Sequence, residues 1–288
     1  MNRTKTINLL LLAVLLMTGC RKEYQSLPEG NAVYYWRTDL RLDSTERAFI
    51  RQYYINKVYC RYFDVVMKEG ATEPTPNATI EFSDSLEIIP TVYITEDCMH
   101  QSHPGLAEKI VRRILQMNET NGIGPVHEIQ MDCDYTSRSR KTYYEFLEDI
   151  GKQCEPLGIH LSATIRLHQL SMVPPPVDYG VLMIYNTGNP AKWEERNPIL
   201  DIRDVAPYLK RLDGYPLPLA AAYPVYLWVR NIQGLRVEHS VEADEILRVK
   251  QAVEEARHDL SRAIITYHLD KDNINRYNPK TYEEIYHH

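Results

Sequence analysis

The chain of 288 residues carries 33 Lys and Arg against 39 Asp and Glu, which gives a formal net charge of −6. An acidic chain of this kind lacks the basic surface that binds nucleic acid, so we exclude nucleic acid as a partner. Its length suits one barrel or two small domains around a sizeable core. The five Cys show no CxxC spacing, which argues against a zinc finger and leaves buried thiols, with room for one disulfide.

The first twenty residues have the pattern of a secretory leader. Arg3 and Lys5 precede an apolar run over residues 7–17, which is too short to cross a bilayer. The run ends in Thr18-Gly19-Cys20, which resembles the lipobox of bacterial lipoproteins. The resemblance implies cleavage before Cys20 and lipidation of that residue; the alternative is an ordinary secretion signal with a chance Cys.

The leader defines the expected organisation of the chain. We expect a signal peptide over residues 1–19, the lipidated Cys and a tether over 20–30, and one barrel domain over 31–288. Loss of Arg3 and Lys5 with the leader takes the net charge from −6 to −8. The expected product is a monomer outside the cytoplasm of a bacterial cell, held on the membrane of the envelope by a lipid at Cys20.

Short apolar runs alternate with amphipathic stretches between residues 32 and 270, as in βα units. Strands are predicted over residues 32–36, 57–63, 87–94, 128–132, 160–165, 180–184, 217–223 and 262–267. Helices are predicted over residues 44–54, 105–118, 140–155, 202–212 and 241–260. Eight strands separated by helices predict an α/β fold, a single-domain (β/α)8 TIM barrel.

Two connections depart from the ideal barrel. Residues 68–85 contain Pro74 and Pro76 and predict a loop with a short extra strand over 78–82 in place of the second helix. The fifth connection, residues 171–179, contains three consecutive Pro and is too short for a full helix.

Active sites of such barrels lie at the carboxyl ends of the strands, so the polar and aromatic residues that follow each apolar run are the candidates. The expected substrate-binding residues are Trp36, Arg37, Arg61, Asp64, Gln130, Arg166, His168, Asn186, Tyr223, Trp228 and His268. The aromatic residues among them suit the faces of sugars, although each could equally be ordinary core.

The fourth predicted strand holds the strongest candidates for chemistry. Side chains two residues apart share a face of a strand, so Gln130, Asp132 and Asp134 should point into the barrel mouth together. Two neighbouring carboxylates repel, which raises the pKa of one and lets it act as a general acid. The alternative is a structural pair of acids with Arg61 or Arg166 as counterions.

The segment HEIQMDCD, from His127, and the later segment Leu182-Met183-Ile184-Tyr185-Asn186 together resemble the signature strands of the family 18 glycoside hydrolases, the chitinase and endo-N-acetylglucosaminidase group. That family has Asp-x-x-Asp-x-Asp-x-Glu on the fourth strand and Met-x-Tyr-Asp on the sixth. The resemblance implies a substrate-assisted glycosidase, with Asp134 as general acid, Asp132 as its electrostatic partner, Tyr185 as a hydrogen-bond donor to the sugar, and no cofactor.

The sequence departs from the family pattern at several positions. Asp134 stands in place of the Glu and is one methylene shorter, while His127, Gln130 and Asn186 replace acids. A misplacement of about 1 Å can cost a hundredfold in rate, so the shorter acid bears directly on catalysis. The strand also resembles that of a group of uncharacterised secreted barrels that end it in Gln-x-Asp-x-Asp.

Other assignments stay open. Asp132, Asp134, His168 and His268 could meet around a metal, but no HxH, HxxxH or HExxH spacing supports one. Arg61 and Arg166 could hold a substrate carboxylate or neutralise the acids. Cys133 should point away from the acids, and Ser162 lacks a nucleophile elbow, so both are interpreted as structural. The hypotheses are a glycan hydrolase, a non-catalytic glycan-binding lipoprotein, and an envelope scaffold.

Overall fold

The computed structural model describes residues 29–287, apart from residue 38, residues 76–78 and 82–85, residue 194 and residues 233–234. Eight parallel strands form a closed barrel, because the first strand pairs both with the last strand and with the second in the ring. The barrel strands are β1 (Gly30–Tyr35), β3 (Ile55–Lys68), β6 (Glu87–Ile94), β7 (Glu128–Asp132), β8 (His160–Arg166), β9 (Tyr179–Met183), β10 (Leu219–Pro224) and β13 (Ala263–Tyr267). The predicted TIM barrel is therefore confirmed.

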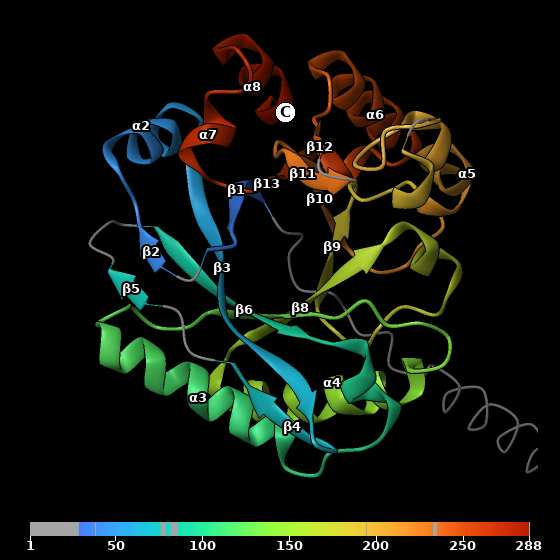
Figure 1. Ribbon diagram of the computed structural model, residues 1–288. Coiled ribbons are helices and arrows are strands. Elements are labelled where there is room, and N and C mark those ends of the chain that lie inside the picture. The colour runs from blue at the N-terminus through green and yellow to red at the C-terminus, as the bar shows by residue number, and fades with distance from the viewer. Residues whose placement is uncertain are drawn as a thin grey trace, which may run out of the picture.

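Helices surround the ring of strands (Figure 1). They are α2 (Ser44–Gln52), α3 (Leu106–Asn121), α4 (Arg140–Cys154), α5 (Ile202–Leu212), α6 (Ala243–Ala256), α7 (Lys271–Ile274) and α8 (Pro279–Tyr286). Short 3-10 turns are η1 (Glu96–His100), η2 (Glu155–Leu157), η3 (Leu167–Ser171), η4 (Pro190–Lys192) and η5 (His258–Arg262). Among the residues described, no helix is long and apolar enough to span a bilayer.

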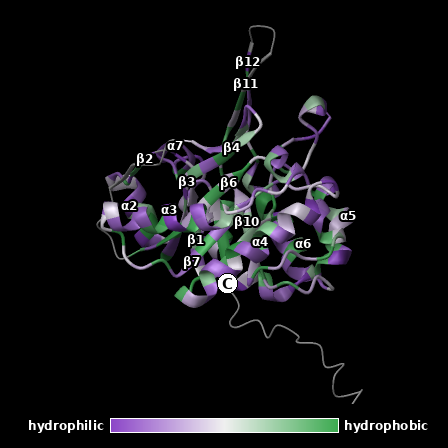
Figure 2. Ribbon diagram, turned by 90° about the horizontal axis from the view of Figure 1, so that it is seen from below, coloured by the Kyte–Doolittle hydropathy of each residue, from purple (hydrophilic) through white to green (hydrophobic). Residues whose placement is uncertain are grey.

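Short strands decorate the mouth of the barrel. Strand β3 runs past the ring and pairs with β4 (Ala71–Pro74), while β2 (Asp39–Arg41) pairs with β5 (Thr79–Glu81). The hairpin of β11 (Trp228–Ile232) and β12 (Leu235–His239) projects from the barrel (Figure 2). The extra strand expected over residues 78–82 is thus present as β5, whereas the other decorations were not predicted.

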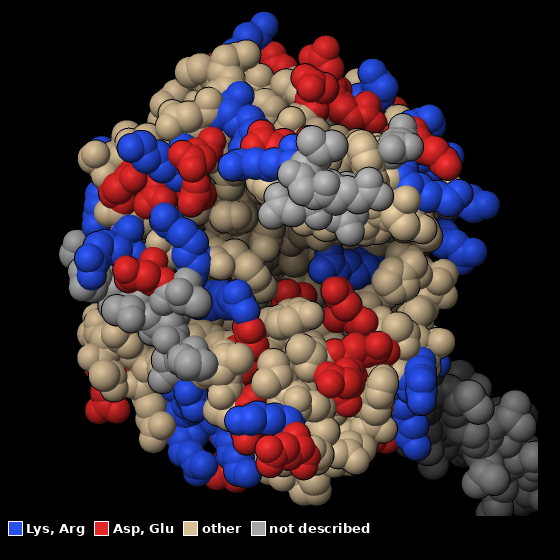
Figure 3. All heavy atoms as spheres, in the orientation of Figure 1, with Lys and Arg blue, Asp and Glu red and all other residues tan. Residues whose placement is uncertain are grey.

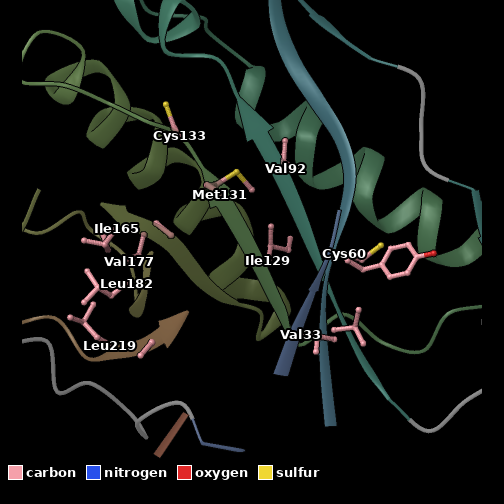
Figure 4. Close-up of a cluster of buried hydrophobic side chains, with 14 of the residues drawn as sticks. Val33, Cys60, Val92, Ile129, Met131, Cys133, Ile165, Val177, Leu182 and Leu219 are labelled. Atoms are coloured by element: carbon pink, nitrogen blue, oxygen red, sulfur yellow. The ribbon is translucent and has the colours of Figure 1, made fainter. Parts of the chain in front are cut away.

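Alternation along the strands sorts side chains between two cores. On β7, Ile129, Met131 and the following Cys133 face the helices, where they join the apolar cluster of Figure 4. Glu128, Gln130 and Asp132 face the barrel axis instead, because their Cβ atoms point to the opposite side of the strand. The predicted outward direction of Cys133 is confirmed.

Most expected element boundaries agree with the structure, and the differences lie at element ends. The helix expected over residues 241–260 stops at Ala256, and η5 replaces its last turn. The second connection carries no helix in its described part, and the fifth has only η3, as expected from their Pro residues. All four described Cys are buried free thiols, so no disulfide joins them, while Cys20 and the leader lie outside the described residues.

Candidate functional site at the barrel mouth

On the face of the molecule shown in Figure 3, a hollow lies among acidic and basic side chains. A cavity of about 310 Å³ opens at the ends of β7, β8 and β9. It is lined by Asp134, Arg166, Leu167, His168, Met183, Tyr185, Asn186, Thr187 and Tyr208. Five of the residues predicted from the sequence therefore meet around one cavity.

Asp132 lies buried at the end of β7 and is not among the residues that line this cavity. Its Oδ1 accepts a hydrogen bond of 2.6 Å from the Thr164 hydroxyl on β8. Burial, with a smaller contribution from the nearby Asp134 charge, raises the pKa of Asp132 to about 6, although Arg166 opposes the shift. Asp132 can therefore hold a proton close to neutral pH.

Asp134 is half exposed, and it forms an ion pair with Arg166 of β8. The Arg166 Nε donates to Oδ1 at 2.5 Å and Nη2 donates to Oδ2 at 3.3 Å. This two-point contact fixes the carboxylate in the cavity wall. Both carboxylate oxygens of Asp134 accept from Arg166, so the structural interpretation of Arg166 as a counterion applies to one edge of its guanidinium.

The loop that follows Asp134 is anchored from the neighbouring strand. Glu96 accepts hydrogen bonds from the hydroxyls of Thr136 at 2.6 Å and Ser139 at 2.8 Å. These bonds lower the pKa of Glu96, because they stabilise its charged form. The loop that carries Asp134 is therefore tied to the end of β6.

Arg166 is held in place by the turn that follows β8. Its backbone N–H donates to the Gln169 Oε1 at 2.8 Å, and the Gln169 amide donates to the Tyr135 carbonyl at 2.9 Å. Burial opposes the charge of Arg166, but the nearby Asp134, Tyr185 and Asp132 outweigh it and raise the pKa. Arg166 thus stays charged, and its Nη1 is buried without a hydrogen-bond partner among the described residues.

Tyr185 follows β9 and lies 3% exposed, with a hydroxyl that has no hydrogen-bond partner in the described part of the chain. Burial raises its pKa, so the hydroxyl keeps its proton as a donor. The ring stacks on Tyr267 at 4.7 Å between centroids, and the Arg166 guanidinium lies 5.6 Å from its centroid. Asn186 is exposed, and its Oδ1 accepts from the Tyr226 hydroxyl at 2.5 Å.

Aromatic rings gather around Tyr267 at the end of β13. Their centroids lie 5.7 Å away for Tyr34, 5.8 Å for Trp36 and 5.4 Å for Tyr226. Trp36 was expected at the mouth, but Tyr226 and Tyr267 were not singled out. The signal for Tyr267 was available, because it shares the face of Ile265 and Ala263 on a predicted strand.

Several predicted binding residues are committed to other partners. The Arg61 Nε donates to the Asp64 Oδ1 at 2.7 Å, and the two side chains form an ion pair with each other. Arg37 forms an ion pair with Glu46 of α2, and with Trp36 it lines a separate hollow beside β1. Gln130 is fully buried and accepts from the Tyr34 hydroxyl at 2.7 Å, so it supports the barrel interior rather than facing the cavity.

The expectation for Tyr223 was wrong. Its position on β10 directs it toward the helices, where it is fully buried. Burial and the charge of Glu254 on α6 both raise the pKa of Tyr223.

Trp228 lies on the β11–β12 hairpin with its ring 6.3 Å from that of His239, outside the cavity lining. His168 is exposed in the cavity wall. His268 is half buried beside Asn273, and burial lowers its pKa.

Two alternatives from the sequence were a metal site and a serine nucleophile. Within the described residues, no group of three His, Cys, Asp or Glu is placed to hold a metal ion. Ser162 lies inside the barrel and donates to Glu128 at 2.6 Å, away from the mouth. The site combines the buried carboxyl of Asp132, the ion pair of Asp134 and Arg166, and several aromatic rings. It also holds the Tyr185 hydroxyl, which has no hydrogen-bond partner among the described residues.

Sequence comparison finds no relative, since no family model and no curated protein matches the chain. Solved structures do match its fold. The spore cortex-lytic enzyme SleL of Bacillus cereus is 15% identical at a TM-score of 0.57, over 91% of this chain and 74% of that one. A chitinase from Chromobacterium violaceum is 12% identical at 0.55, over 90% of this chain and 98% of its own.

A third similar structure was solved with a ligand. It is a mutant of the Group II chitinase catalytic domain 2 of Ostrinia furnacalis in complex with penta-N-acetylchitooctaose. It is 11% identical at a TM-score of 0.55 and covers 89% of this chain and 95% of that chain. At these identities the likeness is one of fold, and this chain shares the barrel of chitinases and of SleL.

Proposed function

We propose that this protein acts on a glycan at the mouth of its barrel, as a glycoside hydrolase-like protein, and that the glycan contains N-acetylglucosamine. The observation that carries the proposal is the cavity lined by Asp134 and Tyr185, with the buried Asp132 two residues before Asp134 along the chain. The shared fold with chitinases and the resemblance of the fourth and sixth strands support the ligand class.

In the hydrolytic form of the proposal, Asp134 protonates the glycosidic oxygen as the acetamido oxygen of the sugar attacks C1. The bond between C1 and the glycosidic oxygen breaks, and that oxygen leaves as a hydroxyl of the released sugar. Asp132 orients the acetamide, and the Tyr185 hydroxyl donates a hydrogen bond to it. Water then opens the cyclic intermediate and returns a proton to Asp134. This chemistry requires the substrate to separate Asp134 from Arg166, because the free protein holds them as an ion pair.

The same ion pair favours a second candidate function, glycan binding without hydrolysis. A carboxylate one methylene shorter than Glu and held by two Arg166 hydrogen bonds is poorly placed to protonate a leaving group. In either form we propose a location outside the cytoplasm, with a lipid at Cys20 as the membrane anchor and the protein as a monomer. The lipobox-like residues 18–20 support the anchor.

The Asp134→Asn variant separates the two functions. If the protein is a hydrolase, wild type releases reducing ends from chitotetraose, and the variant loses that release by at least about a hundredfold while still binding the sugar. Asp97→Asn, which removes an exposed acid at the same end of the barrel, should leave the rate unchanged.

Binding of chitotetraose by calorimetry without release of reducing ends would establish the second candidate instead. Absence of both binding and hydrolysis, for chitotetraose and for a broader panel of glycans, would refute the proposed function.

A further inference from the structure

Two side chains that line the cavity each carry a buried hydrogen-bond donor without an acceptor among the described residues. These donors are Nη1 of Arg166 and the hydroxyl of Tyr185. Both side chains line the cavity, and the guanidinium lies 5.6 Å from the tyrosine ring centroid. Buried donors are rarely left unpaired, because their desolvation is then uncompensated. An acceptor brought by a ligand would compensate that desolvation.

One edge of the Arg166 guanidinium forms hydrogen bonds, and Nη1 on the other edge has no partner among the described residues. Nε and Nη2 hold the Asp134 carboxylate side-on. A guanidinium carries five N–H donors in a planar fork, so its second edge can take another acceptor while the first stays occupied. The two interpretations of Arg166, counterion and ligand-binding group, therefore apply to different edges of the same side chain.

The chemistry of the two donors indicates the kind of acceptor. One donor is permanently charged and the other is a protonated hydroxyl, and a carboxylate presents two oxygens that can meet both. Asp134 and the buried Asp132 oppose a further negative charge here. Burial raises the pKa of Asp132 to about 6, so below that pH its carboxyl is largely neutral and the opposition weakens.

We propose that Arg166 and Tyr185 together bind a carboxylate of the ligand, so that the preferred glycan contains an acidic sugar such as a uronic acid. The inference rests on the proposed function, in that it takes the mouth as a glycan site. It extends that function by naming a charged group of the substrate and the two side chains that recognise it.

Two tetrasaccharides test the proposal. A hyaluronan tetrasaccharide alternates glucuronic acid with N-acetylglucosamine, whereas chitotetraose contains only N-acetylglucosamine. By calorimetry at pH 5 with the full chain, we expect the hyaluronan fragment to bind at least tenfold tighter. Arg166→Gln should weaken that binding by about ten- to a hundredfold, as expected for a hydrogen bond to a charged group, and should change chitotetraose binding by less than threefold.

Two further variants separate direct contact from general attraction. Arg138→Gln removes the same charge from the exposed loop after β7 and should change the affinity for the hyaluronan fragment by less than threefold. Asp134→Asn removes a negative charge that opposes the ligand carboxylate and should tighten binding of the hyaluronan fragment by about tenfold. A residue with a purely structural role would give no such gain.

Each remaining result contradicts the inference in a distinguishable way. Equal or tighter binding of chitotetraose would overturn carboxylate recognition and leave the glycan function standing. Equal losses for Arg166→Gln and Arg138→Gln would reduce the effect to long-range attraction and overturn the contact. If neither sugar bound, both this inference and the proposed function would fall.

Discussion

Asp132 shows how its surroundings set the chemistry of a single residue. The sequence places it beside a second acid, and mutual repulsion was the expected cause of a raised pKa. The structure gives burial as the larger cause, since Asp134 is half exposed and neutralised by Arg166. Spacing along a strand predicts which side chains share a face, but it does not predict how deep each one lies or which partner it finds across the barrel.

This burial should make stability depend on pH in a direction opposite to that of most acids. The folded pKa of about 6 lies above the ordinary value of 3.8, so the folded chain keeps a proton that the unfolded chain releases. The contribution of Asp132 to the free energy of unfolding therefore falls by about 2 kcal/mol as pH rises from 4 to 7. Asp132→Asn should lack this loss.

Urea unfolding of wild type and Asp132→Asn at pH 4 and pH 7 measures the effect as a difference, in which the other buried acids cancel. Asp149→Asn, an exposed acid on α4, serves as the control and should follow wild type. Parallel pH profiles for wild type and Asp132→Asn would contradict the buried, proton-holding state.

At the scale of elements, alternation predicts the direction of most site residues. The prediction that Tyr223 binds substrate did not follow this alternation. On its strand Leu219, Ala221 and Tyr223 share the helix-facing side, while the small Ala220 and Ala222 fit the narrow interior. That pattern of sizes was visible in the sequence. The β11–β12 hairpin and the short helices α7 and α8 gave weaker signals, because each is too short for a clear apolar period.

Gly180 of β9 marks a close approach between elements. A Cβ there would lie 2.7 Å from the Ile165 Cγ1 and 2.9 Å from the Leu219 Cδ2, on the side that faces the helices. Gly180→Ala should therefore destabilise the fold by about 1–3 kcal/mol, as overpacked cores do. Gly151→Ala on α4 meets no atom within 4 Å and should instead stabilise the helix by about 0.5–1 kcal/mol. Thermal unfolding of both variants checks the contrast, and a neutral Gly180→Ala would contradict it.

At the scale of the whole molecule, the eight strands and their order follow from the count of apolar runs alone. Ring closure by β1 brings strand ends that are distant in sequence to one mouth, as the barrel rule predicts. The sequence could not predict the Arg166–Asp134 ion pair, or that the Tyr185 hydroxyl has no partner among the described residues. Both depend on rotamers and on packing across neighbouring strands. The proposed glycan site depends on those atoms.

Tyr185→Phe tests whether the mouth binds a glycan through a donor that has no partner among the described residues of the free protein. The variant deletes a buried hydroxyl without a hydrogen-bond partner in the described chain, so the free energy of unfolding should stay equal or rise by about 1 kcal/mol. Calorimetry with the hyaluronan tetrasaccharide should then show binding weakened by about five- to tenfold, the worth of one hydrogen bond. Equal affinity in wild type and variant, or no affinity in either, would contradict binding through this donor.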